Sequence, residues 1–428
     1  MNTVAKNFLR KRRLFPLIGM FGISCVVAGF LVVQRGQKPA LSPDELFSCF
    51  TSSNGIYTTD AYCLERVVEE LMRVYSTGDL LKYIAAAPTP NHVVHKQAIM
   101  HFHLIAHFIG KQTFLKTGSI EAALEQCEQD VGYGCLHGVI GAAAVKDLGM
   151  SESEAEDLPH ADPKTIERIA AKYCASDNIQ LCHAVGHILF RALPGYSQAL
   201  AICEKTDMKD LNRRETCARG VFMESSGPTG SLSPSQNRPF STETYLQFCD
   251  HVSAEYQHAC FRYLPKIQML FFESKKMDSA AQRLAISIPI CKERTGHTRA
   301  DCIEAIGFNA FHVFIDVNHS DRQDFCNQFD AGADRQSCVL GIAGSYVWGF
   351  DYNGGVAYCH NITDVKKLQD FCYKALFQTS DQVSMGSAIP VICDKESTQK
   401  ECNQKLREYL NTKSTLPNYS LGLYGDRR

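Results

Sequence analysis

The spacing of its cysteines constrains this chain more than any other feature of its sequence. Eighteen of the nineteen cysteines form nine brackets of two residues, 8 to 14 positions apart, whereas 21 to 64 positions separate one bracket from the next. This contrast predicts that each cysteine pairs with its neighbour along the chain, although the order of cysteines does not by itself fix a connectivity. The predicted pairs are Cys49 with Cys63, Cys127 with Cys135, Cys174 with Cys182, Cys203 with Cys217, Cys249 with Cys260, Cys291 with Cys302, Cys326 with Cys338, Cys359 with Cys372, and Cys393 with Cys402.

Nine disulfides indicate an oxidising compartment outside the cytosol. The alternative use of so many cysteines is metal binding by thiolates. The chain has no Cys-x-x-Cys motif, so the signatures of zinc ribbons, thioredoxin-like redox sites and c-type haem attachment are all missing. The sequence therefore favours structural disulfides over thiolate sites.

Most brackets lie in a similar local pattern, in which a helix-like segment ends near the first cysteine and another begins at the second. In the segment before Cys291, apolar residues recur at helical spacing at Ala281, Leu284, Ala285 and Ile288, and alternation typical of strands is scarce. From Cys182 onward the second cysteines follow one another at intervals of 30 to 43 residues, the size of a two-helix repeat. We expect an all-α fold of disulfide-stapled helical-hairpin repeats, similar to an α-solenoid, after one N-terminal transmembrane helix.

Glycines follow the second cysteines repeatedly, at Gly138, Gly141, Gly186, Gly220, Gly307, Gly341 and Gly344. Glycine destabilises a helix interior, so its recurrence calls for a structural reason. Close approach of neighbouring helices is the simplest reason, and it requires no function.

The N-terminus carries the pattern of a membrane anchor. Residues 14–33 contain no charge over twenty positions, enough to span a bilayer as a helix. Residues 1–13 carry five positive charges and are predicted to be a cytoplasmic tail, with residues 34–42 as a linker. We expect a single-pass membrane protein whose main domain is extracytoplasmic, in a periplasmic, lumenal or extracellular space. A cleaved signal peptide, or lipid attachment at Cys25, are the alternatives, and the long apolar run disfavours both.

The remaining chain is predicted to divide at a polar segment. Residues 43–224 form N-terminal helical repeats, residues 225–242 a loop rich in Ser, Pro and Gly, residues 243–411 C-terminal helical repeats, and residues 412–428 a tail. The net charge is -2, and removing the seven positive charges of the first forty residues leaves -9 for the rest. This balance argues against a nucleic-acid partner.

Histidines cluster in the first half of the chain, where nine of the fifteen lie between His92 and His187. Two pairs are spaced by four residues, which places each pair on one helix face. If neighbouring hairpins stack, these imidazoles converge, and imidazoles with one carboxylate suit zinc, iron, copper or nickel. The alternative is a polar groove in which the histidines bond to carbonyls or to one another. The predicted metal ligands are His103, His107, His137, His183, His187 and Glu224.

Two functions follow from these patterns. The first is an extracytoplasmic scaffold, anchored to the membrane, whose helical array binds a protein or peptide partner. The second is a metal-binding protein or metalloenzyme that uses the histidine cluster with a transition-metal ion as cofactor; a haem held by two histidines is a less favoured variant. No HExxH, nucleophile-elbow, phosphate-loop or dinucleotide motif is present, so the sequence names no reaction.

Overall fold

The computed structural model of the chain describes residues 49–53, 56–59, 61–86, 93–127, 133–149, 162–175, 179–193, 195–205, 211–225, 246–314, 324–330, 332–348, 351–362, 365–383, 393 and 399–412. The regular secondary structure of these residues is helical apart from one short hairpin, in agreement with the predicted helical fold. The predicted tail 1–13, span 14–33 and linker 34–42 lie outside the described residues. Among the helices of the described ranges, none is long and apolar enough to cross a membrane.

Most helices are organised by the disulfides. The second cysteine of each bracket lies in a helix, and these helices are α4 (Ala61–Leu71), α8 (Gly134–Asp147), α10 (Ile179–Ala192), α12 (Leu211–Ser225), α13 (Gln257–Phe261), α16 (Gly296–Phe308), α18 (Ala333–Trp348), α20 (Lys366–Val383) and α21 (Gln399–Thr412). Helices that end at or near the first cysteine are α7 (Ile120–Gln126), α9 (Pro163–Cys174), α11 (Tyr196–Lys205), α15 (Ala280–Lys292) and α19 (Tyr352–His360). The first cysteine lies in a short 3-10 helix in η3 (Phe248–His251) and η5 (Phe325–Gln328).

The remaining helices carry no bracketed cysteine. They are α5 (Thr77–Ala86), α6 (Val93–Thr117), α14 (Leu264–Ser274) and the short π-helix η4 (Ala310–Phe314). The predicted loop 225–242 begins at Ser225, the last residue of α12, and its other residues lie outside the described part. The predicted tail 412–428 likewise begins at Thr412, where α21 ends.

All eighteen bracketed cysteines form disulfides with their sequence neighbours, in the predicted pairing. The Cα atoms of the pairs lie 4.5 to 5.8 Å apart, within the range that a disulfide requires. Each bridge therefore joins two segments at the turn between them.

The hairpin is the one departure from the helical expectation in the described ranges. Strand β1 (Phe50–Ser53) pairs antiparallel with β2 (Ile56–Thr59), in a register that sets Phe50 opposite Thr59 and Ser53 opposite Ile56. Between the strands the sequence reads Asn54-Gly55, the strongest two-residue hairpin signal. Threonine, isoleucine and tyrosine favour strands, so the local sequence indicates a hairpin at this position.

Side-chain caps explain where several helices begin. The Asp162 side chain accepts a hydrogen bond from the backbone N–H of Thr165, and Pro163 occupies the first turn of α9. Helix α15 begins with a capping box, in which Ser279 and Gln282 each accept from the other's backbone N–H. Both signals are local, so they define these helix starts without help from tertiary packing.

Three helix pairs cross at reciprocal glycines, as predicted for the glycines that follow the second cysteines. A Cβ added at Gly138 of α8 would lie 1.9 Å from the carbonyl oxygen of His107 in α6, and one at Gly110 would lie 1.9 Å from that of Cys135. The pair α10 and α12 repeats this arrangement through Gly186 and Gly220, and α16 and α18 through Gly307 and Gly341. Gly141 differs, because nothing lies within 4 Å of an added Cβ.

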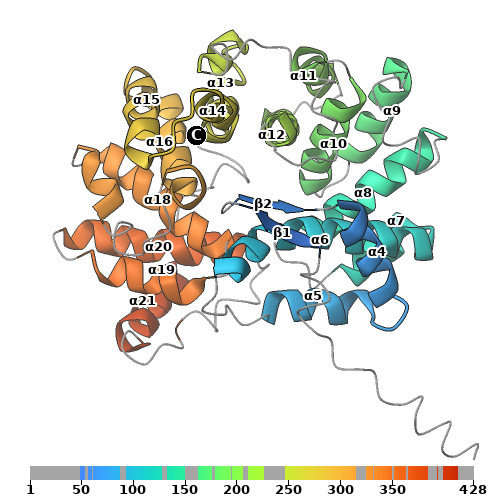
Figure 1. Cartoon of the computed structure of the whole chain (residues 1–428), viewed down its shortest axis with the longest axis horizontal. Helices are drawn as coiled ribbons and strands as arrows, with labels where there is room; N and C mark the ends of the chain where they lie inside the picture. The colour runs from blue at the N-terminus through green and yellow to red at the C-terminus, as the bar shows by residue number, and fades with distance from the viewer. Residues whose placement is uncertain are drawn as a thin grey trace, which may run out of the picture.

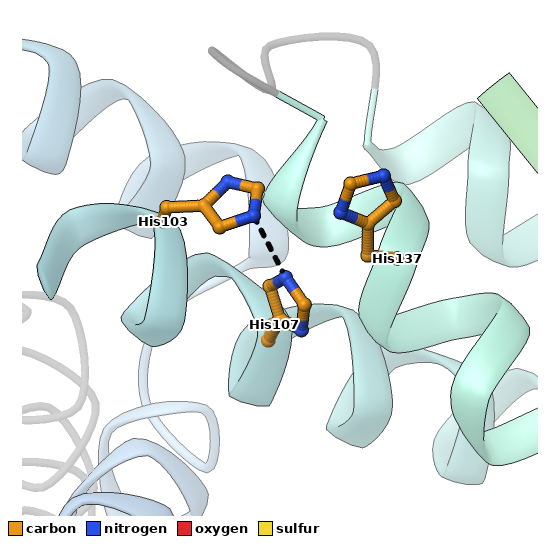
Figure 2. Close-up of side chains that lie close together, drawn as sticks. All are labelled: His103, His107 and His137. Atoms are coloured by element: carbon orange, nitrogen blue, oxygen red, sulfur yellow. Dashed lines mark hydrogen bonds between the residues drawn. The ribbon is translucent and has the colours of Figure 1, made fainter. Parts of the chain in front are cut away.

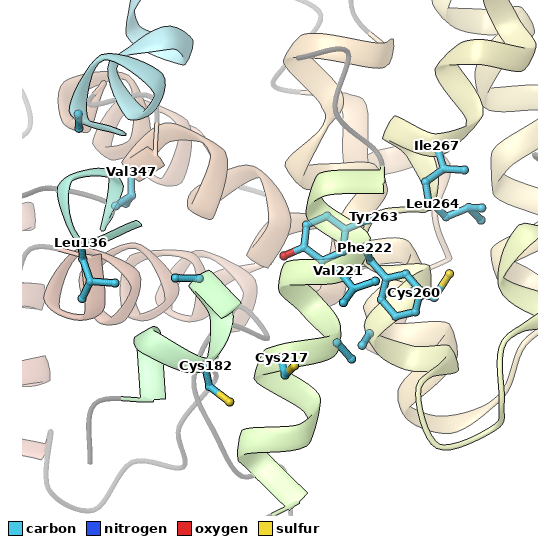
Figure 3. Close-up of a cluster of buried hydrophobic side chains, with 14 of the residues drawn as sticks. Leu136, Cys182, Cys217, Val221, Phe222, Cys260, Tyr263, Leu264, Ile267 and Val347 are labelled. Atoms are coloured by element: carbon cyan, nitrogen blue, oxygen red, sulfur yellow. The ribbon is translucent and has the colours of Figure 1, made fainter. Parts of the chain in front are cut away.

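The core continues from one helix to the next. In Figure 3, Val221 and Phe222 of α12 lie beside Tyr263 and Leu264 at the junction of α13 and α14. The helices follow one another along a curved path from α6 through α12 to α20 (Figure 1). The curve brings the two parts of the chain together, since the ring of Trp348 in α18 lies 6.3 Å from that of His103 in α6.

Candidate metal centre

Five of the six predicted ligands converge on one place, where α6, α8 and α10 meet. His137 of α8 is at the centre. Its ring centroid lies 5.2 Å from those of both His103 and His107, 5.1 Å from that of His183 and 5.3 Å from that of His187. We call these five residues the histidine cluster. Stacking of successive helices, with α8 packed between α6 and α10, brings them together.

The α6 side of the cluster is a pair of imidazoles one helical turn apart. The four-residue spacing places His103 and His107 on one face of α6, and their Nε2 atoms lie 3.0 Å apart. Figure 2 shows both rings turned toward His137 on the neighbouring helix. Close helix approach supports this geometry, because Gly134 and Gly138 of α8 pack against the backbone carbonyls of His103 and His107 respectively.

The α10 side repeats the spacing with His183 and His187, whose Nε2 atoms lie 3.3 Å apart. The opposite ring nitrogen of each has a fixed partner. His183 Nδ1 lies 3.3 Å from the carbonyl oxygen of Thr216, which can only accept a hydrogen bond. His187 Nδ1 lies 2.7 Å from Glu224 Oε2.

These partners determine where the protons lie. Burial raises the pKa of Glu224, but the Arg191 guanidinium and the hydrogen bond from His187 outweigh it, so the pKa is held well below its ordinary value. Glu224 is therefore a carboxylate and an acceptor. Burial holds the pKa of His183 well below 6.5, and because its Nδ1–H donates to the Thr216 carbonyl, the lone pair of the neutral ring lies at Nε2. This lone pair faces Nε2 of His187 at 3.3 Å, in a contact that is a hydrogen bond when a proton lies between the two nitrogens.

The Nε2 separations fit a shared metal ion. Two nitrogens bound at about 2.0–2.1 Å to one ion lie about 2.9 Å apart at a right angle and about 3.4 Å apart at the tetrahedral angle. The observed separations, 3.0 Å for the α6 pair and 3.3 Å for the α10 pair, fall between these limits. Each pair is hydrogen-bonded through its Nε2 atoms, at a spacing that also suits two ligands of one ion.

His137 is the least satisfied member of the cluster. Its side chain is 6% exposed, and neither ring nitrogen has a hydrogen-bond partner among the described residues. Burial, and then the neighbouring His183, hold the pKa of His137 well below 6.5, so the ring is neutral at pH 7. A buried polar ring without partners is costly unless a ligand completes its bonding.

Glu224 lies behind the cluster rather than within it. Its Oε2 accepts from His187 and its Oε1 accepts from Arg191 Nε at 2.8 Å. Among the described residues, the sets of three side chains whose ligand atoms lie within 4.8 Å of one another contain histidines alone: His103, His107 and His137, and His137, His183 and His187. The sequence predicted Glu224 as a metal ligand, and in the structure its carboxylate contacts His187 and Arg191 at the edge of the cluster.

Sequence reasoning missed three other residues of the site. Arg191 lies one turn after His187 in α10, a spacing that could have indicated it. Thr216 acts through its backbone carbonyl, which no residue type signals. Trp348, the only tryptophan of the chain, reaches the cluster from α18, and nothing local in the sequence predicts that contact.

A second group of buried charges, between α13 and α16, is paired internally. Arg262 Nη1 donates to Glu304 Oε1 at 2.9 Å, and both side chains are buried. His258 Nδ1 lies 3.5 Å from Asp301 Oδ2. Because the Glu304 carboxylate is already paired with the Arg262 guanidinium, this group resembles a structural ion pair rather than a metal site.

Comparisons of the chain with protein-family models, with curated proteins and with solved structures found no match. The chemistry of the histidine cluster is therefore the basis for a functional proposal.

Proposed function

We propose that this protein binds a transition-metal ion through the histidine cluster, outside the cytosol. The observation that carries the proposal is His137, a buried imidazole without a hydrogen-bond partner among the described residues, surrounded by four other imidazoles. The other four histidines hydrogen-bond in pairs, His103 with His107 and His183 with His187, as in a structural groove, whereas His137 has no such partner among the described residues. A metal ion bound to His137 would account for its position.

The ligand type restricts the ion. Neutral imidazole suits zinc, copper, nickel and iron, whereas calcium and magnesium prefer oxygen ligands. Each set of three histidines leaves at least one coordination position open on a four-coordinate ion. Three protein ligands with one open position are typical of catalytic zinc sites, in which a bound water becomes acidic enough to react near neutral pH.

The orienting hydrogen bonds also support the proposal. Histidines that bind metals usually donate their other ring N–H to a carboxylate or a carbonyl, which fixes the tautomer and makes the ligand more basic. His187 donates to Glu224, and His183 to the carbonyl of Thr216. Both arrangements leave Nε2 available to an ion.

We infer the extracytoplasmic compartment from the disulfides, and the attachment to the membrane from the N-terminal sequence. Nine disulfides indicate an oxidising, extracytoplasmic environment. We propose that residues 14–33 anchor the chain as a single transmembrane helix, on the strength of their length, hydropathy and flanking positive charges. We also propose that the hairpins are repeats of one unit, because three helix pairs share the same reciprocal glycine contacts.

Metal analysis of the full-length chain tests the function directly. The oxidised protein would be stripped with a chelator, dialysed separately against Zn²⁺, Co²⁺, Ni²⁺ and Cu²⁺, and analysed for bound metal. We expect at least one ion per chain. We also expect Cu²⁺ to quench the fluorescence of Trp348, because the indole lies 6.3 Å from His103.

Variants separate this site from adventitious binding. His107→Ala with His183→Ala should abolish stoichiometric binding, whereas His297→Ala, which replaces an exposed histidine of α16, should leave it unchanged. A chain that takes up no metal, or a double variant that binds as well as the unaltered chain, would rule the function out.

The predicted scaffold function, in which the helical array binds a protein or peptide, stays a prediction. Its basis is the array pattern and the absence of a catalytic motif in the sequence. A crosslinking experiment that captured the same partner with the unaltered chain and with the His107→Ala, His183→Ala variant would favour it over a metal-dependent role.

A further inference from the structure

The two sets of three histidines have one residue in common. His103 and His107 form one set with His137, and His183 and His187 form the other with the same His137. The other two histidines of each set come from different helices, since α6 supplies one pair and α10 the other. The cluster is therefore two three-histidine sites that share a ligand.

A shared histidine can serve two ions only through different nitrogens, because each ring nitrogen has one lone pair in the ring plane. In Figure 2 one nitrogen of His137 faces His103 and His107, and the other lies on the far side of the ring. The ring centroids of His183 and His187 lie at nearly the same distance from His137 as those of the α6 pair. Neither nitrogen of His137 is used by another described group.

We infer that the histidine cluster holds two transition-metal ions, bridged by the imidazole ring of His137. This inference rests on the proposed metal-binding function and specifies its stoichiometry and geometry. One ion is bound by His103, His107 and one nitrogen of His137; the other is bound by His183, His187 and the second nitrogen. The site thus takes a pair of ions of the kind that imidazole prefers, each with an open position for a small ligand.

Binding of the second ion changes the chemistry of His137. The N–H bond of the neutral ring breaks, its electron pair forms the bond to the second ion, and the proton leaves to solvent. The resulting imidazolate carries one negative charge between two cations. This negative charge offsets part of the positive charge that two ions bring into the buried site. Glu224 does not supply that compensation, because its carboxylate is already balanced by Arg191 at 2.8 Å.

The test uses copper, because two Cu²⁺ ions joined by an imidazolate couple their electron spins. The stripped, oxidised full-length chain would be titrated with Cu²⁺ alone, with bound copper measured by elemental analysis and the unpaired spins counted by electron paramagnetic resonance at low temperature. We expect two copper ions per chain. Their spin count should fall well below two as the second equivalent binds.

Each other outcome has a defined meaning. Two ions with the full spin count would overturn the bridge, because the ions would then be independent. One ion per chain would overturn the two-ion inference and leave the proposed function in place. No bound ion would overturn both.

A substitution at the bridge gives a second, independent readout. Any copper that His137→Ala still binds should show its full spin count, because the bridge is missing, while the His297→Ala control keeps the coupling. Circular dichroism would establish that both variants are folded. Should His137→Ala fail to fold, His137→Gln offers a side chain of similar length that cannot bridge as an imidazolate. Coupling that persists in a folded His137 variant would overturn the inference.

Discussion

At the scale of single residues, the site depends on imidazoles that stay neutral. Burial is the largest cause that holds the pKa values of His107, His137 and His183 well below 6.5, and neighbouring histidines lower them further. A neutral ring is the form that binds a metal ion. The same burial that excludes water from the cluster therefore prepares its ligands.

The lowered pKa values predict an acid-sensitive metal-free protein. Below pH 6.5 the unfolded chain binds protons that these three buried histidines do not take up, so the free energy of unfolding falls as the pH decreases through this value. The limit is about 1.4 kcal/mol per pH unit for each histidine. Urea unfolding of the metal-free protein between pH 8 and pH 5, followed by circular dichroism, would measure it. The His137→Leu variant should show a shallower dependence, and a stability that rises on acidification would contradict the account.

Glu224 allows a test of the orienting role. Glu224→Gln keeps the side-chain length but removes the charge that faces His187 and Arg191. Loss of such an orienting partner typically lowers metal affinity about 10- to 100-fold. Competition with a chromophoric chelator would measure the change, and Glu125→Gln, at an exposed position of α7, is the matched control. Equal affinities for the two variants would show that Glu224 does not orient the site.

At the scale of helices, glycine contacts position the histidines. The carbonyls of His107 and His183 are the atoms that Gly138 and Gly220 approach, so two histidines of the cluster lie at helix crossings. In the third pair the corresponding carbonyl belongs to Glu304, whose carboxylate pairs with Arg262. Similar packing therefore supports a candidate metal site in one part of the described chain and an ion pair in another.

Two glycines of α8 provide a controlled comparison. A Cβ at Gly138 would clash with the His107 carbonyl at 1.9 Å, so we expect Gly138→Ala to cost about 1–3 kcal/mol and to weaken metal binding by separating α6 from α8. Gly141 has no atom within 4 Å of its added Cβ, so Gly141→Ala should stabilise the helix by about 0.5–1 kcal/mol. Thermal unfolding and metal titration of both variants would check this. Destabilisation of equal size at both positions would contradict the crossing.

The glycines also show which close helix contacts could be predicted from the sequence. Five glycines that were predicted to mark close helix contacts do so: Gly138, Gly186, Gly220, Gly307 and Gly341. They could be predicted because their recurrence after the second cysteines is visible in a single sequence. Gly141 shares that pattern without the contact. Gly110 was missed, since no bracketed cysteine precedes it in α6. A hairpin was missed as well, although Asn54-Gly55 between two strand-favouring segments indicates one.

At the scale of the whole molecule, the disulfide pairing and the helical fold were predictable, because both depend on local spacing. The convergence of His103, His107, His183 and His187 was also predictable from their four-residue spacing and from stacking of neighbouring helices. His137 was predicted with them, because α8 lies between α6 and α10 both along the chain and in the packing. The approach of Trp348 was not predictable, since it requires the curvature of the entire array.

The bridges are expected to contribute unequally to the site. Replacing Cys127 and Cys135 with serine should cost about 2–5 kcal/mol of stability and also weaken metal binding, because Cys135 lies two residues before His137 in α8. Replacing Cys393 and Cys402, which join a segment to the final described helix, should lower stability without changing metal affinity. Paired denaturation and metal titrations would test this. Weaker metal binding in both variants would contradict a site confined to α6, α8 and α10.

The central claim is that the five imidazoles of the histidine cluster bind metal together, and anomalous diffraction from zinc-soaked crystals of the oxidised protein tests it most directly. The account predicts one anomalous peak bonded to His103, His107 and His137, and a second bonded to His137, His183 and His187, at about 2.0–2.1 Å from each nitrogen. A map in which no peak lies within bonding distance of any of these imidazoles, while zinc is bound elsewhere on the chain, would contradict it.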